Sequence, residues 1–129
     1  MSFVVHENQI EAIPLPGRDL KWLYTPKMRK ARGLSMNCVS IKPGQTVTPA
    51  HSHPKHEEVV YIVSGKGKAF IDGVVHDISA GSAVLFSAGA IHMLRNTGRV
   101  PMKVVCFFAP QATLKDYKFH HDVVFPEET

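Results

Sequence analysis

Regularly spaced turn signals divide the chain into short segments, and this spacing constrains the fold more than any other feature of the sequence. The signals are dipeptides that end in glycine, most of them eight or nine residues apart: Pro43-Gly44, Ser64-Gly65, Asp72-Gly73, Ala80-Gly81, Ala88-Gly89 and Thr97-Gly98. The runs between them are rich in Val, Ile, Phe and Tyr. Short strands at this spacing predict an all-β sandwich or barrel with little helix.

The predicted strands occupy the apolar runs between the turns. They are residues 34–42, 58–63, 68–71, 74–78, 83–86, 92–95 and 102–108, with a further strand at 20–24. The hairpin over 68–78 is the most specific of these predictions. Its central Asp72-Gly73 suits a type I′ turn, which requires positive φ at both positions. Residues 112–118 could form one short turn of helix.

Length and charge favour a single soluble domain. The chain has 129 residues and a formal net charge of +4. One local concentration of basic residues stands out, at Lys27, Arg29, Lys30 and Arg32. No nucleic-acid motif or interleaved aromatic residues accompany it, so we expect a solvated loop and no nucleic-acid partner, although the surplus charge could attract a small anionic ligand. No apolar run reaches membrane-spanning length, and the first residues lack a secretory pattern. These observations predict a cytoplasmic protein without a membrane partner.

Four side chains form a possible metal-ligand set. His51 and His53 are two residues apart, so both imidazoles would project from the same face of an extended segment. Glu58 opens the next predicted strand, and His92 opens a later one. Imidazoles with one carboxylate suit Mn, Fe, Ni, Cu or Zn ions. Taken alone, two histidines at this spacing are more often an ordinary surface or hydrogen-bonded pair than a metal site.

The arrangement of these residues resembles the two sequence motifs of the cupin family. The matching positions of the first motif are His51, His53, Glu58 and Gly65, and those of the second are Gly81, Gly89, His92 and Asn96. The resemblance implies a jelly-roll β-barrel in which His51, His53, Glu58 and His92 hold one divalent transition metal ion. It also implies one domain over residues 1–129. The metal-binding core would span about 34–109, and the segments 1–33 and 110–129 would pack on the barrel. Small cupins of this kind often form homodimers.

Strand parity predicts which residues surround the metal. If Glu58 points inward, Val60 and Ile62 share its face and Tyr61 points outward. Leu94 likewise shares the face of His92. The predicted pocket wall is therefore aliphatic. His56 and Glu57 lie between the ligands in sequence and could contact them on the side away from the metal. Glu57 is the alternative carboxylate ligand if the loop register differs by one residue.

Three functional hypotheses follow from the resemblance. In the first, the protein is an enzyme that binds a small oxygen-bearing molecule (a keto acid, a dicarboxylate or a sugar derivative) at open metal positions. Oxygenase, decarboxylase, lyase and isomerase reactions all fit this hypothesis, and the sequence identifies no general base. In the second, the same site binds a small molecule without reaction. In the third, the protein resembles sugar-phosphate isomerases, and the basic residues at 27–32 contact the phosphate.

Overall fold

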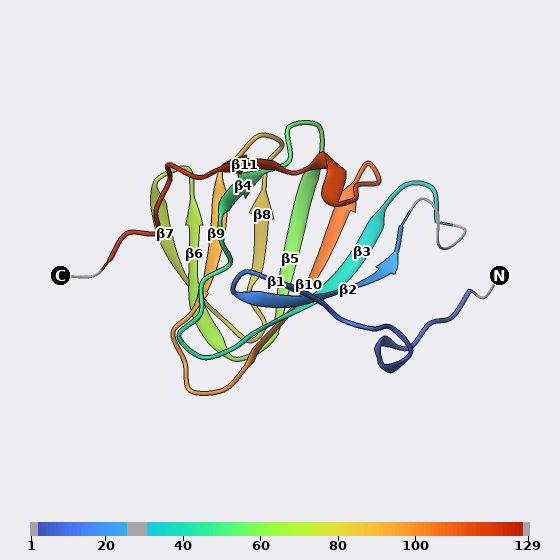
Figure 1. Cartoon of the computed structure of the whole chain (residues 1–129), viewed down its shortest axis with the longest axis horizontal. Helices are drawn as coiled ribbons and strands as arrows, with labels where there is room; N and C mark the ends of the chain where they lie inside the picture. The colour runs from blue at the N-terminus through green and yellow to red at the C-terminus, as the bar shows by residue number, and fades with distance from the viewer. Residues whose placement is uncertain (1–2, 26–30, 128–129) are drawn as a thin grey trace.

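The computed structural model describes residues 3–25 and 31–127, which form two antiparallel sheets facing one another (Figure 1). One sheet contains, in spatial order, β1 (Ile13–Leu15), β2 (Arg18–Tyr24), β3 (Ser35–Ile41), β10 (Met102–Ala109), β5 (Glu57–Ser64) and β8 (Ala83–Phe86). The other contains β11 (Lys118–His120), β4 (Ala50–Ser52), β9 (His92–Asn96), β6 (Lys66–Ile71) and β7 (Val74–Ser79). This arrangement confirms the predicted all-β jelly roll.

Helical structure is limited to two 3₁₀ turns, η1 (Glu7–Gln9) and η2 (Leu114–Asp116), and the described residues contain no α-helix. The second of these turns lies inside the segment 112–118, where the sequence allowed a short helical turn. None of the described segments forms a helix with the length and apolar character needed to span a bilayer.

The core lies between the two sheets because the long strands alternate apolar and exposed side chains. In β5 the side chains of Glu58, Val60 and Ile62 are buried, while those between them are exposed. In β10 the inward positions include Val104 and Phe108, which are fully buried. Each strand thereby contributes one face to a common interior.

The hairpin of β6 and β7 turns where the sequence predicted. Asp72 and Gly73 both have positive φ, 45° and 89° respectively. These values match the backbone that a type I′ turn requires. Register in this hairpin is continuous from the pair Ile71–Val74 outward.

Three strands of three residues each, β1, β4 and β11, were not predicted. β4 follows Pro49 and consists of Ala50, His51 and Ser52, so it has no apolar run that would identify it as a strand. It forms because β9 pairs with it on one side and β11 on the other. Short strands of this kind depend on their neighbours, which a local pattern does not show.

The segments at the two ends contact the sheets. Near the N-terminus, Glu7 forms an ion pair of 2.6 Å with Lys103 of β10. Near the C-terminus, β11 runs beside β4 along one edge of the molecule (Figure 1). Beyond β11, Phe125 packs on Phe70 and Met93, outside the main core. Lys27, Arg29 and Lys30 of the basic cluster lie outside the described residues, and Arg32 is exposed.

Candidate metal centre

The predicted ligands converge because strand register brings them to the same end of the two sheets. His51 of β4 is paired directly with His92, the first residue of β9. On the other sheet, Glu58 near the start of β5 lies between Phe86 of β8 and Phe108 of β10. His53 follows β4 immediately. Segments far apart in sequence therefore present these side chains to a single interior space.

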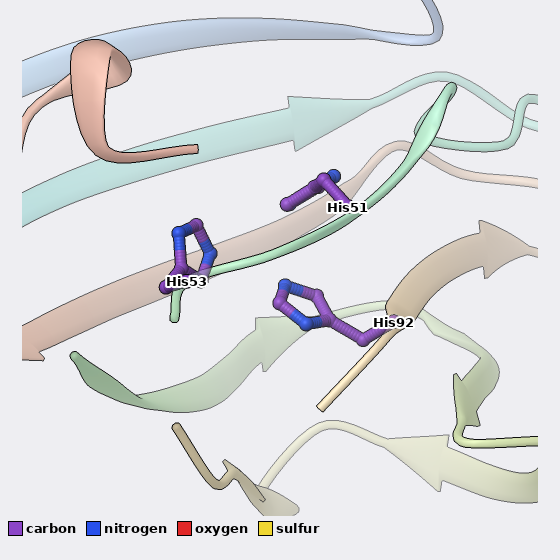
Figure 2. Close-up of side chains that lie close together, drawn as sticks. All are labelled: His51, His53 and His92. Carbon is purple, nitrogen blue, oxygen red and sulfur yellow. The ribbon is translucent and has the colours of Figure 1, made fainter. Parts of the chain in front are cut away.

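The three histidines form a tight buried cluster, which Figure 2 shows with His51 and His53 on one segment and His92 on another. One ring nitrogen from each lies within 4.8 Å of those of the other two. Glu58 Oε1 is 3.1 Å from His53 Nε2 and 3.2 Å from His92 Nε2. The relative exposures of all four residues are between 2% and 5%, so water does not screen them. Such a cluster could hold a metal ion.

Two backbone contacts determine which nitrogen each ring presents. His51 Nδ1 lies 3.2 Å from the Pro49 carbonyl oxygen, and His92 Nδ1 lies 3.0 Å from that of Ala90. A carbonyl oxygen only accepts hydrogen bonds, so Nδ1 carries the proton in both rings. In the neutral rings Nε2 is then an unprotonated electron-pair donor, which is the form that binds a metal.

The polar atoms that face one another in this cluster lack hydrogen bonds. His53 Nδ1 and Nε2, Glu58 Oε1 and His92 Nε2 are all buried without a hydrogen-bond partner among the described residues. The short Glu58–histidine distances therefore do not correspond to aligned hydrogen bonds. Leaving several such atoms unpaired in the interior is costly. A cation bound among them would remove this cost, and the donor set of three imidazoles and one carboxylate fits a divalent transition metal.

Electrostatics keep these groups in the states that favour a cation. Burial lowers the pKa of His51 well below its ordinary value, and the neighbouring His92 lowers it further. Burial also lowers the pKa of His53. For Glu58, burial alone would raise the pKa, but its contacts with His53 and His92 outweigh burial, so the pKa falls well below the ordinary range. Neutral His51 and His53 rings beside an ionised Glu58 carboxylate match the protonation states of a metal-binding set.

Aromatic rings hold the ligand rings in place. Phe86 stacks on His92 with centroids 3.8 Å apart and planes 10° apart. Tyr117, just after η2, stacks on His51 at 5.0 Å and 15°, and meets His53 edge-on. These contacts restrict ring rotation, so the ligand nitrogens are positioned before any ligand binds. Nothing in the local sequence around Tyr117 predicts this role, because it depends on the pairing of β11 with β4.

The predicted pocket-wall residues are all buried, but they occupy different places. Val60 and Ile62 lie in the core below Glu58, and Leu94 lines a small cavity beside the histidines. Tyr61 is 46% exposed on the outer face of its sheet, as strand parity predicted.

His56 and Glu57, which lie between the proposed ligands in sequence, have different environments. Glu57 is exposed at the start of β5, whereas Glu58 is buried in the cluster. His56 is buried, with Nδ1 2.9 Å from the Pro110 carbonyl oxygen and Nε2 3.7 Å from Asp116. His56 thus connects the loop before β5 to the C-terminal segment.

The cavity beside the histidines reveals polar residues that sequence reasoning missed. It has a volume of about 30 Å³, and its polar lining besides the histidines and Cys106 comes from Arg18, Asn37 and Tyr117. Asn37 is a polar residue at an inward position of β3, and the alternation of side chains along this strand could have identified it from the sequence. Arg18 opens β2, which β3 and β10 separate from the strand of Glu58, so its proximity to His51 is visible only in the fold.

The two cysteines occupy core positions. Cys38 and Cys106 are both free and buried, as expected from their apolar surroundings in sequence. Burial, followed by the charge of Glu58, raises the pKa of the Cys106 thiol well above its ordinary value. Cys106 therefore remains a protonated core residue.

Comparison with known proteins agrees with this geometry. The cupin domain family matches residues 37–108, which is more than half of the chain. The chain therefore belongs to the cupin family. Protein SchB of Streptomyces halstedii is 32% identical over 113 residues, an alignment that covers 88% of this chain and 80% of that protein.

Solved structures share the fold at low sequence identity. A Thermotoga maritima protein described as a predicted oxalate decarboxylase superposes with a TM-score of 0.75 at 20% identity, covering 84% of this chain and 99% of that one. The Streptomyces protein PAC13 with uridine superposes with a TM-score of 0.76 at 17% identity, covering 93% of this chain and 92% of that one. PAC13 is described as a nucleoside dehydratase. These similarities establish the fold and leave the substrate open.

Proposed function

We propose that this protein is a metal-dependent cupin enzyme that acts on a small oxygen-bearing molecule. In this proposal one divalent transition metal ion is held by His51, His53, Glu58 and His92. The observation that supports it is the convergence of buried ligand atoms without hydrogen-bond partners, with Glu58 Oε1 3.1–3.2 Å from two imidazole nitrogens. A structural role alone does not account for a shared space in which His53, His92 and Glu58 leave buried polar atoms unpaired beside His51.

A divalent ion bound there would supply Lewis acidity and, if redox-active, a site for dioxygen activation. The chain's own residues would bind and orient the reactant. The rings of Phe86 and Tyr117 hold the imidazoles in position, and the buried setting excludes bulk water from the reacting atoms. Similarity to proteins named for oxalate decarboxylation and nucleoside dehydration makes decarboxylation and elimination the first reactions to examine.

Metal content tests the proposal. Protein purified without an affinity tag should contain close to one transition metal ion per chain. The double variant His51→Ala/His92→Ala removes two of the four ligands and should abolish binding. Full occupancy in that variant would show that the metal binds elsewhere.

His76→Ala is the matched control for this experiment. His76 lies on β7, is exposed, and belongs to the hairpin on the far edge of the second sheet. Its removal changes the histidine count without touching the cluster, so the metal content should equal that of the wild type.

Turnover distinguishes an enzyme from a binding module. We expect protein loaded with Fe(II), Mn(II) or Ni(II) to convert at least one compound in a panel of keto acids, dicarboxylates and sugar derivatives. Oxygen consumption, carbon dioxide release and product mass report the reaction class. Saturable binding without conversion of any compound would instead identify a non-catalytic binding protein.

We also propose that the protein forms a homodimer through the outer face of the β10–β5–β8 region. Phe107, Val59 and Leu85 are cross-strand neighbours in a single row, and Tyr61 lies in the next row. These four side chains are 38–53% exposed. A contiguous apolar face on a sheet favours association, and a second copy of the same face would be complementary under two-fold symmetry.

A further inference from the structure

The cavity beside the histidine cluster has one charged side chain in a mostly apolar wall. Its lining includes His51 and His92, so it opens directly onto the proposed metal position. Most of the remaining wall is apolar, and Arg18 is the one lining residue with a formal charge at neutral pH. The cavity of about 30 Å³ has room for roughly two water-sized groups, so it would hold part of a small ligand whose remaining atoms lie toward the proposed metal position.

Arg18 is held in place by the backbone around it. It is 8% exposed, and its Nη1 donates hydrogen bonds of 3.1 Å to the Pro16 carbonyl oxygen and 3.3 Å to that of Thr48. The preceding Gly17 has φ of 78° and packs so closely on the backbone of Thr46 that a Cβ would lie 1.8 Å from its carbonyl oxygen. Only glycine fits this turn, and Arg18, the next residue, lines both the cavity and a separate surface hollow that includes Asp19 and Gln45.

Among the described residues no carboxylate lies within ion-pair distance of the Arg18 guanidinium, and the charge of Glu58 acts on it only from further away. Within residues 3–25 and 31–127, Arg18 forms no ion pair, and its hydrogen bonds use only Nη1. A buried arginine without a carboxylate is costly unless another anion balances it. Glu58 does not supply this balance in the proposed metal-bound state, because its charge offsets only half that of a divalent ion.

Asn37 provides an unpaired acceptor. Its side chain is 1% exposed, lines the same cavity and contacts the Tyr117 hydroxyl, while its Oδ1 is buried without a hydrogen-bond partner among the described residues. A carbonyl oxygen of this kind accepts a hydrogen bond, so its natural partner is a hydroxyl group. The cavity thus combines the Arg18 guanidinium, which can donate hydrogen bonds to an anion, with Asn37 Oδ1, which can accept a hydrogen bond from a hydroxyl group.

From this arrangement we infer that the site recognises a small hydroxycarboxylate. The carboxylate pairs with Arg18, since a guanidinium fork matches two carboxylate oxygens, and a hydroxyl group of the ligand donates to Asn37. This inference rests on the proposed metal function and specifies the substrate class of that site. The small cavity volume favours acids of few carbon atoms over nucleosides.

Calorimetric titration with three matched probes tests the inference. Glycolate has both a carboxylate and a hydroxyl, acetate lacks the hydroxyl, and glycolamide lacks the charge. Metal-containing wild-type protein should bind glycolate more tightly than either of the others. Arg18→Gln should weaken glycolate binding by roughly ten- to a hundredfold, the loss expected for a charge-assisted hydrogen bond. Lys66→Gln removes an exposed charge from β6 and should change nothing.

Metal content measured on the same samples separates the two proposals. Arg18→Gln with unchanged metal and unchanged glycolate affinity would overturn the hydroxycarboxylate inference and leave the metal function intact. Tighter binding of glycolamide or uridine than of glycolate would also overturn it. Wild-type protein without metal would refute the proposed function and this inference with it.

A second variant covers the case in which Arg18→Gln does not fold. Asn37→Leu preserves the shape of the side chain and removes its acceptor. The preference for glycolate over acetate should then fall about tenfold, the value of one hydrogen bond that discriminates between ligands. An unchanged preference would contradict the role of Asn37 and the inference.

Discussion

At the scale of single residues, the site depends on side chains that restrict one another. His92 is held between its hydrogen bond to the Ala90 carbonyl oxygen and the face of Phe86. His51 is held in the same way by the Pro49 carbonyl oxygen and the ring of Tyr117. Positioning the imidazoles before ligand binding reduces the entropy lost when a metal binds. The aromatic residues therefore support both the core and the positions of the imidazoles.

Replacing Phe86 should affect both stability and metal affinity. Phe86 is 2% exposed, so Phe86→Ala should lower the free energy of unfolding by about 3–5 kcal/mol. Phe86→Leu should cost less stability but still weaken metal binding, because it removes the ring that stacks on His92. Urea denaturation and competition with a metal chelator measure the two effects.

Phe119→Ala is the control for the loss of an aromatic ring. Phe119 is 46% exposed on β11, so its removal should cost well under half as much stability as Phe86→Ala. Equal losses at the two positions would contradict the role assigned to Phe86.

At the scale of secondary structure, Asn96 ties the end of β9 to two other segments. Its Nδ2 donates hydrogen bonds of 2.8 Å to the carbonyl oxygens of Ile41 and Val100, and its Oδ1 accepts one of 2.8 Å from the Gly98 amide. Ile41 is the last residue of β3, in the opposite sheet. Asn96 is fully buried, so each of these bonds replaces one that water would make in the unfolded chain.

Asn96→Ala should therefore destabilise the fold far more than an exposed asparagine would. It leaves two carbonyl groups and an amide without their side-chain partner, and we expect a loss of about 3 kcal/mol in the free energy of unfolding. Asn8→Ala, at an exposed position in η1, should change it by less than about 0.5 kcal/mol. Chemical denaturation of both variants measures the difference, and similar values would refute the role of Asn96.

At the scale of the whole molecule, the two faces of the larger sheet differ in the side chains they carry. Its inner face supplies Glu58, Arg18 and Asn37 to the interior. Its outer face carries the apolar row of Phe107, Val59 and Leu85, which no segment among the described residues covers enough to bury. We expect this outer face to join two copies of the protein, with the metal sites separated from the interface by the thickness of the sheet.

A charge placed on this face should prevent association. Wild-type protein should have the mass of a dimer by light scattering after gel filtration, and Leu85→Glu should have the mass of a monomer. Val100→Glu places the same charge at a residue that is 56% exposed and outside the apolar row, so it should remain dimeric. A monomeric wild type at concentrations of roughly 100 µM would refute the dimer, since stable interfaces are saturated there.

The sequence predicted the parts of this protein that local patterns specify. The hairpin at Asp72-Gly73 was predictable because its turn needs positive φ at both positions, and the inward set of β5 because side chains alternate. The proximity of His51, His53 and His92 followed from the motif resemblance. Arg18 could not be placed, because its distance from His51 depends on how β2 lies against β3 and how the turn at Gly17 packs on Thr46. Long-range register of this kind has no local signature.

The central claim is that His51, His53, Glu58 and His92 bind one metal ion together. Anomalous X-ray diffraction from crystals of untagged protein, measured above and below the absorption edge of the metal found by elemental analysis, tests it most directly. We predict a single anomalous peak about 2.0–2.2 Å from one nitrogen of each histidine and from a Glu58 oxygen. A metal-containing crystal with its only peak outside this cluster, or a peak without Glu58 as a ligand, would contradict the account.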